Sequence, residues 1–317
     1  MAKRPQENIL KNIETLDVIA APLLRWFHSE KRALPWREEP TPYRVWVSEI
    51  MLQQTRVEAV KPYFERFVAA LPDVRALARA DEDTLMKLWE GLGYYSRARH
   101  LQSAARLICS DHGGEIPAHF DGLLALPGIG RYTAGAVASI AFGERRPAVD
   151  GNVLRVIMRL LACPADILKE STKRAVEEAL IARLPENAGD FNQALMELGA
   201  LICLPRGAAR CPSCPLERLC LAKEANLQAE LPQKTPPKRR RTEKLTIFLL
   251  AKNGKIALEK RPAQGLLAGL WGFPAMEGHL KKKEAEEALQ AIGLIPAKLH
   301  ALPAAQHIFS HITWQMV

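Results

Sequence analysis

The sequence has little that would suit a membrane-bound or exported protein. No apolar run approaches the roughly 20 residues that a membrane-spanning helix needs. The first residues, from Met1 to Pro5, are polar or basic and lack the apolar stretch of a signal peptide. We therefore expect a cytoplasmic protein that does not associate with a membrane.

Cysteine is scarce and unevenly placed, with six residues in a chain of 317. Cys109 and Cys163 stand alone within apolar helical patterns, whereas the other four crowd into one short segment: Cys203, Cys211, Cys214 and Cys220. Because a cytoplasmic chain keeps its thiols reduced, four crowded cysteines indicate a metal site and not disulfides. The spacing alone leaves tetrahedral zinc and an iron–sulfur cluster open.

Strand-like alternation is absent from the first two thirds of the chain. Apolar residues recur there at three- and four-residue steps, for example from Leu16 to Phe27, as in amphipathic helices. We predict an all-α region over residues 1–225, with Asp81 as the N-cap of one helix. Its further helices are predicted at residues 43–55, 81–91, 96–109, 133–142, 153–161, 172–184 and 191–203.

The composition changes after residue 225. Residues 226–243 include the proline-bearing basic run from Leu231 to Arg241, which we interpret as a solvated linker; contact with phosphate is the alternative. Farther on, Asn253-Gly254 stands between two apolar segments and favours a two-residue hairpin turn. A second, α+β domain is therefore predicted over residues 244–317.

The charge balance suits a polyanionic partner. Lys and Arg number 44 against 35 Asp and Glu, which gives a net charge of +9. Nucleic acid is one such partner, although ribosomal and membrane-surface proteins share this bias.

A glycine-containing hairpin, Leu126-Pro127-Gly128-Ile129-Gly130, precedes the predicted helix at residues 133–142. Gly128 and Gly130 can adopt backbone angles that are closed to other residues, so the hairpin can turn its N–H groups toward one anion such as a phosphate. Arg131 beside it supports this interpretation. A plain turn between two packed helices is the alternative.

Two carboxyl groups, those of Glu49 and Asp150, are candidates for catalysis. Glu49 lies on a helix that is apolar nearly all round, so desolvation should raise its pKa and make it a candidate general acid; a buried ion pair is the alternative. Asp150 opens a predicted helix, where it can be a plain N-cap and where N–H groups and the helix dipole favour its ionised form. An acid paired with a carboxylate suits glycosidic cleavage through an oxocarbenium-like sugar.

The order of these motifs resembles the endonuclease III superfamily of all-α helix-hairpin-helix glycosylases with an iron–sulfur loop. The resemblance rests on Leu126 to Ala134, on Val149 to Val153 and on the cysteines that follow. Within the superfamily, Trp46 to Thr55, Gly91 to Arg97 and Phe191 to Gly199 resemble the MutY family of adenine DNA glycosylases, which end in a MutT-like (Nudix) domain. The match runs from about Leu16 to the end of the chain.

The resemblance implies a base-excision-repair enzyme that flips out and removes adenine mispaired with 8-oxoguanine or guanine in double-stranded DNA. We expect it to act as a monomer at a bacterial nucleoid. It implies that Glu49 protonates adenine and that Asp150 stabilises the sugar cation, with Tyr132 and Asn152 supporting Asp150 and the attacking water. The other matched positions are Trp36, Arg37, Leu52 and Gln193 around the adenine; Gln54, Thr55, Leu92 and Tyr94 in the emptied stack and at the oxidised guanine; Gly128 and Gly130 at the DNA; and Phe309, Ser310 and His311 as readers of 8-oxoguanine.

The residue after Arg131 distinguishes two chemistries within the superfamily. Enzymes similar to endonuclease III carry there a lysine that attacks the sugar, whereas this chain carries Tyr132. A phenol cannot form a Schiff base, so the resemblance implies a monofunctional glycosylase.

The resemblance also implies a [4Fe–4S] cluster held by Cys203, Cys211, Cys214 and Cys220. The gap between Cys203 and Cys211 is one residue longer than the family pattern, so Gly207 or its neighbours must absorb a bulge. Arg206 and Arg210 in this loop would face phosphate.

The C-terminal segment departs from a working MutT enzyme. Leu270 to Pro274 resembles that fold, but Gln290 and Ala291 stand where glutamates should hold magnesium. We therefore expect the domain to read 8-oxoguanine and not to hydrolyse nucleotides. The sequence stops at Val317 in what looks like a strand, so the domain is either smaller than in the family or cut short.

Two other functions stay open at the level of the sequence. One is a lyase similar to endonuclease III that acts on oxidised pyrimidines, against which Tyr132 and the C-terminal domain argue. The other is a non-catalytic DNA-binding scaffold, against which Glu49 and Asp150 argue in their matching motifs.

Overall fold

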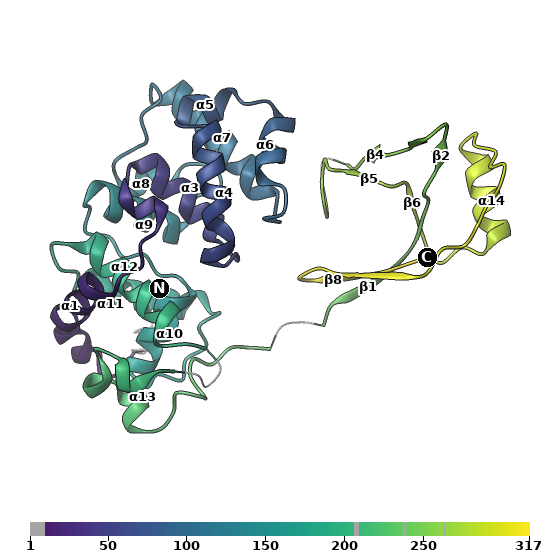
Figure 1. Ribbon diagram of the computed structural model, residues 1–317. Coiled ribbons are helices and arrows are strands. Elements are labelled where there is room, and N and C mark those ends of the chain that lie inside the picture. Colours follow the sequence, from purple (N-terminus) through teal and green to yellow (C-terminus); the bar gives the residue numbers. More distant parts are fainter. Residues whose placement is uncertain (1–9, 206–208, 237–238, 263) are drawn as a thin grey trace, which may run out of the picture. The chain divides into compact units, whose positions relative to one another are not determined.

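The structure is a computed structural model that describes residues 10–205, 209–236, 239–262 and 264–317. The chain forms two compact units, Met1–Thr235 and Pro236–Val317 (Figure 1). Within the described ranges, every regular element before Arg241 is a helix, and none is long and apolar enough to span a bilayer. These helices are η1 (Ile13–Val18), α1 (Ala20–Glu30), α2 (Pro35–Glu38), α3 (Pro42–Leu52), α4 (Val57–Ala70), α5 (Val74–Arg79), α6 (Glu82–Trp89), α7 (Ser96–Asp111), α8 (Phe120–Leu124), α9 (Arg131–Phe142), α10 (Gly151–Leu160), α11 (Glu170–Ile181), α12 (Ala188–Leu201), η2 (Cys211–Ser213), η3 (Glu217–Leu219) and α13 (Leu221–Glu224).

Local signals explain where several helices begin and end. The Asp81 carboxylate accepts a hydrogen bond from the Thr84 N–H at 2.8 Å and caps α6, as predicted. The predicted helix at residues 43–55 ends earlier, at Leu52, because Gln54 adopts a left-handed conformation with φ 59°. The periodic stretch from Leu16 to Phe27 is divided between η1 and α1, and its apolar face is nevertheless buried.

The first unit contains two hydrophobic cores. One is built from α2 to α9 around Trp46, Phe64 and Trp89. The other is built from η1, α1 and α10 to α13 around Phe27 and Phe191. Helix α9 packs against α3 in the first core and against α12 in the second, so the two cores meet along α9.

Most of the predicted linker's first half belongs to the first unit. The Arg159 Nε donates to the Leu231 carbonyl at 2.9 Å, and the Ile167 N–H donates to the Gln233 carbonyl at 3.2 Å. The predicted linker at 226–243 is therefore too long: the chain leaves the first unit after Thr235, and strand β1 begins at Arg241. Pro237 and Lys238 of the predicted basic run lie outside the described residues.

The second unit contains a small mixed sheet and one helix. Strand β1 (Arg241–Ile247) lies parallel to β8 (Ile312–Met316) and antiparallel to β6 (Ala275–Glu277), while β7 (Ala305–Ile308) pairs antiparallel with β8. Two short antiparallel pairs accompany this sheet: β2 (Ala251–Lys252) with β3 (Lys255–Ile256), and β4 (Glu259–Lys260) with β5 (Trp271–Gly272). Helix α14 (Lys282–Ala291) covers Phe248 with Ala285 and Leu289.

The predicted hairpin turn is confirmed. Asn253 and Gly254 join β2 to β3 with φ angles of 49° and 72°. Two successive positive φ angles are those of the two-residue turn whose twist matches the flanking strands.

A close backbone approach on α9 yields a stability prediction. A Cβ atom added at Gly135 would lie 2.2 Å from the Pro147 carbonyl oxygen, in the segment that leads to Asp150. We expect Gly135→Ala to destabilise the protein by about 1–3 kcal/mol through overpacking. The matched control is Gly151→Ala, since nothing lies within 4 Å of its added Cβ and α10 should gain up to about 1 kcal/mol of helix propensity. Urea unfolding measures both, and equal unfolding midpoints for the two variants would contradict the prediction.

Candidate active site

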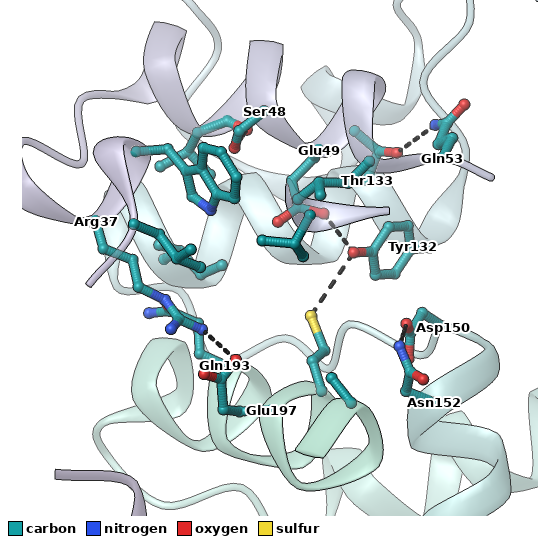
Figure 2. A pocket seen from close by; sticks show the side chains of 18 of the residues that line it. Arg37, Ser48, Glu49, Gln53, Tyr132, Thr133, Asp150, Asn152, Gln193 and Glu197 are labelled. Carbon is teal, nitrogen blue, oxygen red and sulfur yellow. Dashed lines mark hydrogen bonds and ion pairs between the residues drawn. The ribbon is translucent and has the colours of Figure 1, made fainter. Parts of the chain in front are cut away.

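A pocket of about 800 Å³ opens between the two helical cores of the first unit. Figure 2 shows Glu49 and Tyr132 pointing toward one another, with Asp150 and Asn152 below Tyr132, and Arg37 and Gln193 across from them. Of the predicted site residues, the pocket brings together Trp36, Arg37, Glu49, Leu52, Gln54, Thr55, Gly130, Tyr132, Asp150, Asn152 and Gln193.

Glu49 lies near the end of α3 with only 6% of its surface exposed. The Tyr132 hydroxyl donates a hydrogen bond to its Oε2. Burial raises the pKa of Glu49 to about 7; the Tyr132 hydrogen bond lowers this pKa, and the nearby Asp150 raises it. Among the described residues no cation lies within ion-pair distance of Glu49, so the alternative of a buried ion pair does not apply.

Tyr132 contacts a different carboxylate from the one implied by the family resemblance. Its hydroxyl bonds Glu49, whereas the resemblance implied support for Asp150. Burial raises the pKa of Tyr132 well above its ordinary value, and the two neighbouring carboxylates raise it further. The hydroxyl therefore stays protonated and acts as a donor to Glu49.

Asp150 is the N-cap of α10. Its carboxylate accepts hydrogen bonds from the Val153 N–H at 2.7 Å and from the Asn152 side-chain amide at 2.8 Å. The expectation that the helix terminus favours its ionised form is only half right. Burial raises the pKa of Asp150 above its ordinary value, although these two hydrogen bonds and Arg155 lower it.

Helix α10 connects Asp150 to the cysteine segment through side chains on one face. The Arg155 guanidinium donates to the Asn152 side-chain oxygen and to the Cys203 carbonyl, both at 2.8 Å. One turn later, Arg159 Nη1 lies 3.2 Å from the Cys203 Sγ. A continuous set of contacts therefore runs from the Asp150 carboxylate to a predicted metal ligand.

An ion-pair network lines the side of the pocket where the base is predicted to lie. The Glu197 carboxylate is buried and receives two side-chain hydrogen bonds at 2.8 Å from Arg32 and one at 3.1 Å from Arg37. Burial would raise its pKa, but these bonds outweigh that effect and hold it at about 2. Arg37 Nε also donates to the Gln193 side chain at 2.9 Å, so two predicted pocket residues are held in place together.

The sequence interpretation missed several residues of the pocket. Met196 and Glu197 line it because they lie three and four positions after Gln193 on α12, the spacing of one helix face. That spacing could have identified them. Arg32 and Ser48 also line the pocket, and no motif singled them out.

Leu92, Tyr94 and Gly128 do not line the pocket. Leu92 is buried, whereas Tyr94 is 47% exposed and adopts a left-handed φ of 48°. The Tyr94 side chain is thus presented at the surface.

The hairpin between α8 and α9 agrees with its prediction at Gly128 but differs from it at Gly130 and Arg131. Gly128 has a φ of 75°, and an added Cβ there would lie 2.5 Å from the Cβ of His100. Gly130 has a φ of −91°, which other residues can adopt, and it is the N-cap of α9. Arg131 forms a two-bond ion pair with Glu177 at 2.7 and 2.8 Å, so its guanidinium is already engaged. Within the described residues the N–H groups of Gly128 and Gly130 donate no hydrogen bond, which leaves them available to an anion.

The predicted reading loop of the second unit forms the turn between β7 and β8. The Phe309 N–H donates to the Ile312 carbonyl at 2.8 Å, and the Phe309 ring packs edge-on against Trp314 at 4.9 Å. Ser310 and His311 are exposed at the tip.

Three of the four crowded cysteines, Cys203, Cys214 and Cys220, pack against the second core. Cys203 follows α12, Cys211 begins η2, Cys214 follows η2, and Cys220 precedes α13. Burial, together with the charges of the other three thiols, raises the pKa of the Cys214 thiol to about 12. Among the described residues, no three His, Cys, Asp or Glu side chains converge as the ligands of a single ion would. Gly207 and Arg206, which were predicted to absorb a bulge and to face phosphate, lie outside the described residues.

Comparisons with known proteins agree on one family. Residues 47–182 match the HhH-GPD superfamily of base excision DNA repair proteins, and residues 246–317 match the NUDIX domain. The human adenine DNA glycosylase is 35% identical and aligns with 98% of this chain and 70% of its own length. This chain belongs to the adenine DNA glycosylase family. It is a DNA glycosylase of base excision repair, and the predicted family and fold class are confirmed.

Two further relatives support the assignment. The adenine DNA glycosylase of Buchnera aphidicola subsp. Schizaphis graminum is 32% identical, and the alignment covers 96% of this chain and 87% of that protein. The solved structure of a thermostable thymine-DNA glycosylase has a TM-score of 0.59 and 29% identity, over 67% of this chain and 98% of the other.

The contact between Tyr132 and Glu49 leads to a prediction about pH. If Glu49 must be protonated, single-turnover base release should fall as the pH rises through about 7. Tyr132→Phe removes a donor that stabilises the carboxylate, so the pKa of Glu49 should rise and the fall should move to higher pH by about one unit. Tyr43→Phe makes the same change in a buried tyrosine that bonds the Leu71 carbonyl and should leave the profile in place. A shift of the Tyr132→Phe profile toward lower pH would refute this account.

Proposed function

We propose that this glycosylase removes adenine mispaired with 8-oxoguanine, and also with guanine, and leaves an abasic site without cutting the strand. The observation that carries the proposal is a buried carboxyl group, Glu49, that is half protonated near neutral pH and faces the same pocket as Asp150. Such a pair suits acid-assisted departure of a base from its sugar.

The proposed chemistry assigns one role to each carboxyl group. Glu49 donates its proton to a ring nitrogen of the flipped adenine, which makes the base a better leaving group. Asp150 then stabilises the positive charge that develops on the sugar, and Asn152 holds its carboxylate in place. Water then bonds to the sugar carbon that the base has left, and its proton passes to the Asp150 carboxylate.

The monofunctional outcome follows from the chemistry at the end of the hairpin. Tyr132 presents a phenol that is already engaged with Glu49, and no lysine of the described residues lines the pocket except Lys31. Lys31 stands over the Phe27 ring, with its Nζ 5.4 Å from the centroid. The Tyr132 position therefore offers no amine for a Schiff base with the sugar.

Recognition of the mispair is assigned to four segments. Gln54 and Thr55, together with buried Leu92 and exposed Tyr94, are proposed to fill the emptied stack and touch the oxidised guanine. The exposed tip at Ser310 and His311 is proposed to read 8-oxoguanine from the second unit. The hairpin N–H groups at Gly128 and Gly130 are proposed to bind a phosphate at the N-terminus of α9.

The four cysteines fit a [4Fe–4S] cluster better than a zinc ion. Their thiols act on one another's ionisation, yet they do not converge as the ligands of a single ion do. In a cluster each thiolate binds its own iron, whereas zinc draws four ligands around one centre. Cys203, Cys211, Cys214 and Cys220 would hold the group, which would stabilise the fold of this segment. Arg159 beside Cys203 would offset the thiolate charge.

The acid role of Glu49 can be tested by a substitution that preserves shape. Glu49→Gln should bind A:8-oxoguanine DNA normally but release adenine at least about a hundredfold more slowly, the usual contribution of a general acid. Single-turnover kinetics are required because slow product release can mask the chemical step. Glu90→Gln is the control, since Glu90 is exposed and pairs with Lys87 outside the pocket.

Several outcomes would contradict the proposal. Near-normal turnover by Glu49→Gln would show that Glu49 is not the proton donor. Strong covalent trapping with borohydride on oxidised-pyrimidine DNA would favour the lyase. If the unaltered protein releases no adenine from either A:8-oxoguanine or A:G duplexes, the result would favour the alternative of a non-catalytic DNA-binding scaffold.

The metal site has a direct optical test. Purified protein should be brown with broad visible absorbance, and Cys214→Ser should lose that colour because one ligand is missing. Cys109→Ser should keep it, since this cysteine lies apart from the other four. A colourless preparation that contains zinc and is active on DNA would exclude the cluster.

A further inference from the structure

Arg97 is a buried cation whose bonds are unusual. It lies in the first turn of α7 with 9% of its surface exposed. Among the described residues it forms no ion pair with a carboxylate, and its guanidinium donates instead to five backbone carbonyls. The first turn of a helix disfavours a cation, so helix α7 itself gives no reason for an arginine at this position.

The two terminal nitrogens of Arg97 serve two different segments. Nη1 donates to the carbonyls of Ile50 at 2.7 Å, Met51 at 3.0 Å and Gln53 at 2.7 Å. Nη2 donates to the carbonyls of Leu92 and Gly93, both at 3.2 Å. One planar group therefore joins the end of α3 to the loop between α6 and α7.

Each joined segment contains a residue in a strained conformation. Gln54 and Tyr94 have φ angles of 59° and 48°, in the left-handed region that side chains other than glycine rarely adopt. Such conformations persist only where the surroundings hold them. The Arg97 guanidinium lies 5.6 Å from the centroid of the Tyr94 ring, so it also supports that side chain directly.

The chemistry of the contact requires an arginine. The carbonyls of Ile50 and Met51 belong to the last turn of α3, where unpaired carbonyls attract a cation. Lysine would bring a similar charge on a single nitrogen, which cannot reach both segments in the fixed fork geometry of a guanidinium. Glu49 precedes Ile50 on α3, so the same contact fixes the catalytic helix end relative to both loops.

We propose that Arg97 is a positioning residue that holds residues 53–55 and 91–94 as one rigid unit, so that both segments enter the opened base stack together. This inference rests on the proposed function, which assigns these segments to the mispair. Arg97 does not line the pocket that is proposed to receive the base and the sugar. Its effect should therefore be largest where a paired adenine must be extruded from the stack and smallest where the adenine is already unpaired.

The test compares Arg97→Lys on two substrates of the same sequence. One holds adenine opposite 8-oxoguanine in a duplex, and the other holds the adenine in an unpaired bulge. Arg97→Lys should slow single-turnover adenine release from the duplex by about tenfold or more, the effect of losing one hydrogen bond to a charged group. On the bulge the rate should stay within about threefold of the unaltered protein. Arg106→Lys is the control, because Arg106 is an exposed arginine of α7 that donates to the Ala78 carbonyl.

The outcomes separate this inference from the function on which it rests. Equal slowing on both substrates, or slowing on neither, would overturn the role of Arg97 while leaving the glycosylase activity established. An unaltered protein that releases no adenine from either substrate would overturn the proposed function, and the DNA role of Arg97 with it.

A measurement on the unaltered protein covers the case in which Arg97→Lys does not fold. Native-state hydrogen exchange should show the amides of Thr55 and Leu92, which donate to the carbonyls of Leu52 and Trp89, opening with a common free energy, since one side chain holds both segments. Two segments that open independently would contradict the shared restraint.

Discussion

The active site depends on the exclusion of water from one carboxyl group. Glu49 is placed on a helix whose neighbouring side chains, Val45, Trp46 and Ile50, are all buried in the first core. Burial there disfavours the charged carboxylate and raises the pKa of Glu49 to about 7, so about half of the group is protonated at neutral pH. Tyr132 supplies a single donor, which keeps the group oriented without abolishing its acidity near pH 7.

Buried arginines join segments of the chain that are distant in sequence. Arg97, Arg155 and Arg159 are all buried, and each donates mainly to backbone carbonyls. A guanidinium has five donors in a fixed plane, so one side chain can satisfy carbonyls from several loops at once. In this protein such contacts hold the end of α3, the start of α10 and the cysteine segment. Glu197 has the inverse role, because one carboxylate gathers two arginines beside the pocket.

Much of the first unit could be predicted because its helices carry periodic apolar faces. The predictions failed mainly at element ends and in electrostatic detail. Helix α3 ends at Leu52, and the Gln53 carbonyl just beyond it accepts a hydrogen bond from Arg97, which lies 44 positions later and cannot be found from a local pattern. Residues 226–235 look like a solvated linker but are held by hydrogen bonds from Arg159 and Ile167. The pKa of Asp150 follows burial more than the helix terminus, and burial is a property of the packed chain.

The sequence by itself determined the family, the helical character of the first unit, the hairpin turn at Asn253-Gly254 and the residue types able to do the chemistry. These features are local, since a motif, a period or a turn pair is complete within a few residues. Only the tertiary structure decided that Tyr132 bonds Glu49 and not Asp150, and that Arg131 is already paired with Glu177. The reason is physical: Glu49 and Tyr132 are separated by 83 positions, and their contact forms only when α3 and α9 pack in the first core.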